Sequence, residues 1–368
     1  MRLPSFNDLI PEQRDVFEVA PDRSILVVGP PGSGKTSMAI WRARVLVSPE
    51  LKRTVVLITR NRLLSAVAEQ LAQENDGAYI SSTTMHSYVS RDYSSRFSEN
   101  VPQWQPYDYI WSEINRRYEA AGVTPDLDHL IIDEGQNLPL EFIKWAVRFK
   151  ARAVSVFADE NQSTLYGGCC VADLQAAGFT DVYPLVVNHR NTKEIADVSA
   201  YFHNSRALPP ATPKRGRGFD IPCLTAVPTW DALADIIAAR MENRAEAVGV
   251  IVYLKDEVIH LANLLRQRLG RRRVDSYTSD ATPGAESAIQ MRDSGVTVIS
   301  GESAIGLEFD TLYLQDLSRS LPATALIQSR RLYMLCARAR NKLVLIDGPS
   351  RLTQAQLTSL PPDHILER

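Results

Sequence analysis

Short apolar runs alternate with helix-like segments along the first half of the chain. Runs rich in β-branched residues occur at 25–28, 55–58, 130–132 and 154–157. Continuous apolar strands separated by helices are typical of a parallel sheet that is covered on both faces. The pattern therefore predicts an α/β domain in this half.

The second half repeats this pattern. A connecting helix is predicted at 191–202, before a Pro-, Gly- and Arg-containing loop at 208–219. Apolar spacing predicts an amphipathic helix over 256–269 and a longer one over 323–340. Further strands are predicted at 248–254, 296–299, 311–314 and 342–346.

Two domains are expected from the length of the chain. Single cores usually stop growing near about 250 to 300 residues, and this chain has 368. We place the first domain at 1–185, with a short insertion at about 90–128, and the second at 186–368. The fold class is α/β, with a mainly parallel sheet in each domain.

Composition narrows the class of protein. The apolar fraction is 45% and the charged fraction 23%, both near globular averages. No apolar run approaches the length of about 20 residues that spans a bilayer, and the first residues lack the features of a secretory signal. We therefore expect a cytoplasmic protein without a membrane partner. The four cysteines show no C-x-x-C spacing, so we interpret them as reduced thiols.

Residues 29–36 carry the strongest chemical signal. They read Gly-Pro-Pro-Gly-Ser-Gly-Lys-Thr, directly after the apolar run 25–28 and before a helix-like segment, as the G-x-x-x-x-G-K-[ST] phosphate-binding loop requires. Lys35 is expected to contact the β- and γ-phosphates, and Thr36 to ligate Mg²⁺. The loop residues expected to surround the phosphates are Gly29, Gly32, Ser33 and Gly34.

Two carboxylates follow the predicted strand 130–132. Ligands of open α/β sheets collect at the carboxyl ends of strands, so Asp133 and Glu134 are well placed for phosphate chemistry. Asp133 is suited to hold Mg²⁺, and Glu134 to deprotonate an attacking water. Gln162 follows the next apolar run in the same way and is a candidate sensor of hydrolysis.

Two arginines are candidates for stabilising charge on a transferring phosphoryl group. They are Arg190 and Arg338, and Arg338 is expected on the helix 323–340. Taken alone, each arginine fits a surface ion pair better than a catalytic role. The net charge of −2 gives no overall attraction to nucleic acid, so any site for a polyanion must be local.

The order of the motifs resembles the UvrD/Rep/PcrA group of superfamily 1 helicases, in particular compact relatives that are fused to nuclease-related domains. The resemblance extends from Gln13 to about Ile346. The segments that carry it are Gln13, the loop 29–36, and residues 57–62, 83–87, 132–137, 158–163, 188–191, 303–310 and 332–340.

The resemblance implies two RecA-like P-loop NTPase lobes with reduced insertions, which bind ATP and Mg²⁺. It implies that Gln13 reads the adenine, and the absence of a guanine signature at 341–344 agrees with ATP. Gln162, Arg190 and Arg338 are then expected near the γ-phosphate. His189 stands where the family usually has an adenine-stacking tyrosine. Gly306 and Glu308 are expected near the nucleotide.

The resemblance also implies a site for single-stranded DNA. The expected contact residues are Arg60, Asn61, His86 and Tyr166. Arg60 replaces a phenylalanine on which a base would stack, and Glu302 and Ile305 replace a histidine and a lysine. The insertion contains Trp104, Tyr107, Tyr109 and Trp111, which are expected to pack on the first domain or on a partner.

Two functions remain open at this stage. The first is an ATP-dependent helicase or translocase that acts on single-stranded DNA and unwinds weakly alone. The second is an ATP-gated switch or interaction subunit of a nuclease or phage-defence complex, which the substitutions at 60, 302 and 305 favour. A kinase or GTPase is a distant third because neither explains the late arginines.

Overall fold

The computed structural model describes residues 3–73, 79–159, 168–203, 211–291, 293–315 and 317–368. Their contacts divide the chain into two compact units. The N-terminal unit contains Leu3–Gly29 and Gly34–Leu185, and the C-terminal unit contains Pro30–Ser33 and Val186–Arg368. No helix of the described residues is long and apolar enough to cross a membrane.

The N-terminal unit is built on a parallel sheet with the strand order β3-β2-β6-β7-β1-β8. The apolar runs that predicted strands form its four interior members. The strands are β1 (Ile25–Val28), β2 (Val55–Thr59), β3 (Ser81–Thr84), β6 (Leu127–Ile132), β7 (Ala151–Ala158) and β8 (Val182–Pro184).

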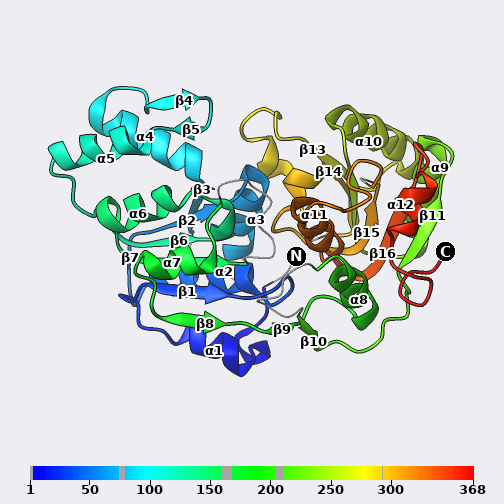
Figure 1. Ribbon diagram of the computed structural model, residues 1–368, viewed down its shortest axis with the longest axis horizontal. Coiled ribbons are helices and arrows are strands. Elements are labelled where there is room, and N and C mark those ends of the chain that lie inside the picture. The colour runs from blue at the N-terminus through cyan, green and yellow to red at the C-terminus, as the bar shows by residue number, and fades with distance from the viewer. Residues whose placement is uncertain (1–2, 74–78, 160–167, 204–210, 292, 316) are drawn as a thin grey trace. The chain divides into compact units, whose positions relative to one another are not determined.

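Helices lie on both sides of this sheet (Figure 1). Alternate residues of β6 and β7, such as Ile132 and Val156, face a core that includes Phe142 and Trp145, because side chains of a strand point to opposite faces. The helices are α1 (Pro11–Phe17), α2 (Lys35–Val47), α3 (Arg62–Ala72), α4 (Met85–Phe97), α5 (Trp111–Ala120), α6 (Leu140–Phe149) and α7 (Val171–Ala176). A two-stranded hairpin, β4 (Gln103–Gln105) and β5 (Asp108–Tyr109), joins α4 to α5.

The C-terminal unit has a second parallel sheet, with the order β11-β16-β15-β12-β14-β13. The predicted α/β fold class with two mainly parallel sheets is confirmed, and it is consistent with two RecA-like lobes. The strands are β11 (Cys223–Ala226), β12 (Ala247–Val252), β13 (Val274–Tyr277), β14 (Gly295–Ser300), β15 (Phe309–Leu314) and β16 (Ala339–Asp347).

One face of this second sheet is covered by α9 and α10. Val248 and Val250 of β12 pack there against Ile237 and Leu261. The helices are α8 (Lys193–Tyr201), α9 (Trp230–Asn243), α10 (Lys255–Leu269), α11 (Leu326–Cys336) and α12 (Gln354–Thr358). Outside the sheet, β9 (Val187–Asn188) pairs with β10 (Thr212–Pro213).

One predicted helix is too long. The helix expected over 323–340 ends at Cys336, and β16 already begins at Ala339. The carbonyl of Arg338 accepts a hydrogen bond from the N–H of Phe309, and Asn191 Nδ2 donates to the carbonyl of Ala339. These long-range hydrogen bonds end the helix, so Arg338 lies in a turn and not on the helix as predicted.

Candidate nucleotide site

The loop 29–36 connects β1 to α2 in the way its sequence predicted. Gly32 has φ +81° and Gly34 has φ +93°, backbone conformations that a side chain disfavours. At Gly34 a Cβ atom would also lie 2.7 Å from Nε2 of Gln13. Glycine is therefore needed at both positions for the chain to turn into α2.

Lys35 begins α2 and is almost fully buried. Its Nζ donates to the carbonyl oxygen of Gly29 at 2.7 Å and lies 3.8 Å from Oδ2 of Asp159. A buried ammonium group requires such partners. The contacts hold the charge of Lys35 against the loop that it is predicted to serve.

Gln13 lies beside the same loop. Its Oε1 accepts a hydrogen bond from the N–H of Ile10 at 3.3 Å, which helps begin α1. The side chain is buried, and its amide end is adjacent to Gly34. The structure thus brings Gln13 together with the phosphate-binding loop, although its proposed contact with adenine stays a prediction.

Asp133 follows β6 and carries a deeply buried carboxylate. Neither of its oxygens makes a hydrogen bond of standard geometry to the described residues. Burial raises the pKa of Asp133, and the neighbouring carboxylate of Glu134 raises it further. Thr36 and Lys35 lie close enough to oppose this rise. These groups offset the cost of burial only in part, and a bound cation would stabilise the charged carboxylate further.

Glu134 has an unusual backbone conformation. It is buried, and its φ of +57° lies in the left-handed region that non-glycine residues seldom adopt. Its Oε2 accepts a hydrogen bond from Nε2 of Gln136 at 2.5 Å. Gln136 Oε1 in turn accepts from the N–H of Asp159 at 2.9 Å. Strained conformations of this kind concentrate at functional sites.

Gln136 thus links the ends of β6 and β7 and orients Glu134. Sequence reasoning assigned it no role of its own. The only signal was its place in the 132–137 motif. Its side chain supplies both hydrogen bonds in this link, so it is a positioning residue for the carboxylate.

The donor set around Asp133 fits Mg²⁺. This ion prefers oxygen ligands and keeps several waters, with one or two protein groups and substrate phosphates completing its shell. Asp133 and Thr36 offer a carboxylate and a hydroxyl. No group of three or more His, Cys, Asp or Glu side chains that could hold a metal occurs within the described residues.

In the C-terminal unit, Arg190 forms an ion pair with Glu308. Arg190 Nε donates to Glu308 Oε2 at 2.7 Å. Although burial raises the pKa of Glu308, the charges of Arg190 and Arg340 hold it well below its usual range. The turn that carries Arg190 is fixed by Asn188 Oδ1, which accepts from the N–H groups of residues 190 and 191.

Arg338 follows the end of α11, and its side chain is buried. Its Nε donates to the carbonyl of Met334 at 3.2 Å, and its Nη1 to that of Leu307 at 3.4 Å. Leu307 lies between Gly306, with φ +82°, and Glu308. The structure therefore gathers Arg190, Arg338, Gly306 and Glu308, four predicted site residues, in one region of the C-terminal unit.

A family model described as an AAA domain matches residues 12–168. The first half of the chain resembles AAA-type P-loop domains. A P-loop domain of this type implies nucleotide binding, and the assignment of the site to the loop 29–36 stays a prediction.

The comparison with solved structures includes the C-terminal domain of a possible DNA helicase from Lactobacillus plantarum WCFS1. It is 20% identical, with a TM-score of 0.35, and the match covers 49% of this chain and 98% of that one. At this level the likeness supports no inference. No curated protein matches the sequence.

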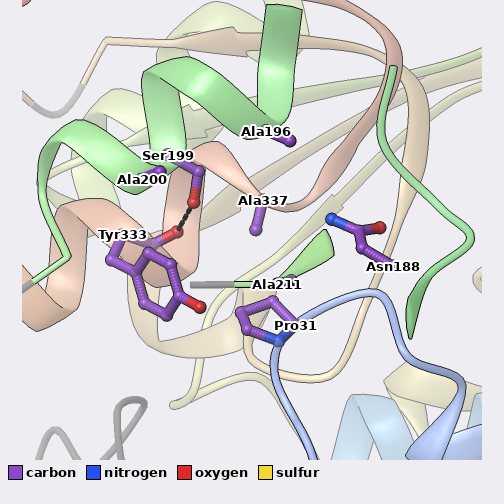
Figure 2. Close-up of a pocket in the computed structure, with 8 residues that line it drawn as sticks. All are labelled: Pro31, Asn188, Ala196, Ser199, Ala200, Ala211, Tyr333 and Ala337. Atoms are coloured by element: carbon purple, nitrogen blue, oxygen red, sulfur yellow. Dashed lines mark hydrogen bonds between the residues drawn. The ribbon is translucent and has the colours of Figure 1, made fainter. Parts of the chain in front are cut away.

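A small pocket in the C-terminal unit is lined by Asn188 and Pro31. The N–H of His189, next to Asn188 in the chain, donates to the carbonyl of Gly32 at 2.9 Å. Ser199 Oγ donates across the pocket wall to the carbonyl of Tyr333 at 2.8 Å. The described lining contains no cationic side chain, so the pocket does not match a phosphate site. Its lining residues are Pro31, Asn188, Ala196, Ser199, Ala200, Ala211, Tyr333 and Ala337 (Figure 2).

Three of the four predicted nucleic-acid contacts, Arg60, Asn61 and His86, are described and lie in the N-terminal unit. Arg60 follows β2, and His86 lies in α4. Burial lowers the pKa of His86 to about 4, and the charge of Arg60 contributes, so His86 is neutral near pH 7. Asn61 caps α3, where its Oδ1 accepts from the N–H of Leu64 at 2.8 Å. Gln162 and Tyr166 lie outside the described residues.

Proposed function

We propose that this chain is an ATP-dependent translocase of the UvrD/Rep type that acts on single-stranded DNA and unwinds duplexes weakly by itself. The observation that carries this proposal is the buried carboxylate of Asp133, which lacks a hydrogen-bond partner in the described structure. It belongs to the same unit as Lys35 and Thr36 at the start of α2. This combination suits a site for a nucleotide with Mg²⁺.

In this proposal the phosphate-binding loop holds the phosphates and Lys35 neutralises their charge. Thr36 and Asp133 hold Mg²⁺, which when bound neutralises charge on phosphate oxygens. Glu134, oriented by Gln136, accepts the proton of the attacking water. The water oxygen forms a bond to the γ-phosphorus while the bond to the leaving ADP breaks.

The remaining assignments follow from the resemblance. Gln13 reads the adenine, and His189 stacks on it. Arg190 and Arg338 stabilise charge on the transferring group, with Gln162 as a further contact. Because Arg190 is paired with Glu308, its role in catalysis requires that it exchange or share this partner.

A second candidate function is an ATP-gated subunit of a nuclease or phage-defence complex. Ile305 is buried, and Glu302 forms an ion pair with Arg331 at 2.7 Å. The C-terminal unit thus has neither cation that the family carries at these two positions. This favours a protein in which DNA is a ligand and not a track.

Steady-state ATP hydrolysis distinguishes the two functions. The whole chain is assayed with Mg²⁺, with and without a single-stranded oligo(dT), and Lys35→Ala serves as the control. A translocase should hydrolyse ATP at least about tenfold faster with the oligonucleotide, which corresponds to about 1.4 kcal/mol of barrier. Hydrolysis that depends on Lys35 but ignores the oligonucleotide would favour the gated subunit. Hydrolysis unaffected by Lys35→Ala would refute both.

A further inference from the structure

Two exposed aromatic side chains stand on the β4–β5 hairpin. Trp104 is 77% exposed and Tyr107 is 74% exposed. The hairpin lies beside α4 at the margin of the N-terminal unit (Figure 1). The aromatic residues of this insertion were expected to pack on the first domain or on a partner. Tyr109 is buried, whereas Trp104 and Tyr107 are exposed.

The inward members fix the hairpin in place. Tyr109 is buried, and its hydroxyl donates to the carbonyl of His86 at 3.0 Å. Its ring packs on Trp111 with centroids 5.8 Å apart, and Trp111 packs on Phe142 at 6.1 Å. The two exposed rings therefore project from a support that is anchored in the core.

Tyr107 is held in an unfavourable backbone conformation. Its φ of +72° is rare for a bulky residue and is typical of functional segments. The Tyr107 ring lies edge-on against His86, with centroids 5.1 Å apart. The hairpin thus continues the surface of α4 that carries a predicted DNA contact.

Two nitrogens near the Tyr107 ring are buried without a hydrogen-bond partner in the described structure. Among the described residues, buried Nδ1 of His86 and buried Nε of Arg60 have no hydrogen-bond partner. The charge of Arg60 acts on the imidazole, so the two side chains are close. An exposed ring, a guanidinium and an unpartnered imidazole nitrogen suit a strand with bases and phosphates.

We propose that Trp104 and Tyr107 form a base-stacking arm that extends the single-stranded DNA site beyond Arg60 and His86. The inference rests on the proposed function. The rings stack on bases while Arg60 contacts the backbone. A single strand suits the arm better than a duplex, whose bases already stack on one another. A purely apolar protein partner would leave the polar nitrogens of Arg60 and His86 unused.

The test is the affinity of the whole chain for fluorescent oligo(dT), measured by anisotropy. The Trp104→Ala/Tyr107→Ala double variant should bind about tenfold or more weakly, as loss of base–aromatic stacking predicts. The Trp104→Phe/Tyr107→Phe variant, which keeps both rings, should retain affinity. Tyr79→Ala is the matched control because Tyr79 is 64% exposed and precedes the amino end of β3, whereas Arg60 follows the carboxyl end of the parallel strand β2.

A second readout does not depend on how the alanine variant folds. An oligonucleotide carrying 5-iododeoxyuridine is photo-crosslinked to the unmodified chain, and the linked residue is found by mass spectrometry. Crosslinks at Trp104 or Tyr107 would support the arm, and crosslinks only elsewhere would overturn it.

The outcomes separate the two proposals. If the unmodified chain binds oligo(dT) and a folded double variant binds it equally well, the arm is wrong, the hairpin is left to a protein partner, and the proposed function stands. If the unmodified chain does not bind oligo(dT), the proposed function itself fails.

Discussion

Each of the two units has its own six-stranded parallel sheet. Their candidate site residues differ in how the charged side chains are compensated. In the N-terminal unit, the Asp133 carboxylate is buried without a hydrogen-bond partner in the described structure, and Glu134 has a strained backbone. In the C-terminal unit, Arg190 is paired with Glu308, and Arg338 donates to two backbone carbonyls. The charge of Asp133 is only partly compensated by Thr36 and Lys35, whereas that of Glu308 is paired with Arg190.

The largest expected effect is on the rate of ATP hydrolysis and concerns Glu134, whose backbone is strained. Glu134→Gln should reduce ATP hydrolysis on the order of 100- to 10,000-fold, because general base catalysis contributes about that much. ATP affinity should be unchanged, since the amide still accepts from Gln136. Steady-state turnover tests the predicted loss of hydrolysis, and nucleotide titration tests the unchanged affinity. Glu141→Gln, at an exposed position of α6, is the matched control, and normal turnover in Glu134→Gln would remove the assigned base.

Breaking the ion pair between Arg190 and Glu308 should reduce stability. Arg190→Gln should lower the free energy of unfolding by about 2 kcal/mol, because Glu308 loses its closer cation and keeps the more distant Arg340, at 3.6 Å. Adding Glu308→Gln should recover most of this loss, since neither charge then remains. Urea unfolding of the two single variants and the double variant measures the coupling. Additive losses would show that the pair contributes nothing as a pair.

Replacing Asp133 should raise the free energy of unfolding, whereas replacing Arg190 should lower it. Its pKa is raised in the folded chain, so the native state keeps a proton that the unfolded state has already lost. The ligand-free protein should therefore lose stability as the pH rises from about 4 toward neutrality. Asp133→Asn should remove this slope and raise the free energy of unfolding near pH 7 by about 1 kcal/mol. Unfolding at several pH values, without Mg²⁺ or nucleotide, measures the slope. Equal slopes in both proteins would contradict the account.

Gln13 provides the smallest expected effect. Gln13→Ala should weaken ATP binding roughly threefold, because one neutral hydrogen bond contributes as little as about 0.6 kcal/mol. GTP binding should change less, because the glutamine is proposed to read adenine. Titration with both nucleotides tests this, and an equal loss for both would indicate that Gln13 only supports the loop beside Gly34.

The interior strands of both sheets could be predicted from sequence because they are continuous apolar runs, as in 25–28 and 154–157. The edge strands could not. β3 has the sequence Ser-Ser-Thr-Thr and β13 Val-Asp-Ser-Tyr, and a strand at the edge of a sheet needs no continuous apolar run. The end of α11 was also missed, because hydrogen bonds from Phe309 and Asn191, distant in sequence, determine it.

The phosphate-binding loop was predicted from its motif. The groups that compensate the charges of Asp133 and Arg190 were not predicted. The sequence does not show how the charge of Asp133 is compensated, or that Glu308 is the partner of Arg190, since both depend on residues that only folding brings together. The left-handed conformations of Glu134 and Tyr107 were equally hidden, because neither residue is a glycine.

The central claim is that the carboxylate of Asp133 is completed by Mg²⁺ together with a nucleotide. The most direct test compares ATP affinity with Mg²⁺ and with a chelator, in a Glu134→Gln background that prevents turnover. We expect Mg²⁺ to strengthen binding at least about tenfold, or 1.4 kcal/mol, and Asp133→Asn to abolish most of that gain. If the Asp133→Asn variant kept the full gain, Asp133 would not be the metal ligand and the account of the N-terminal site would be wrong.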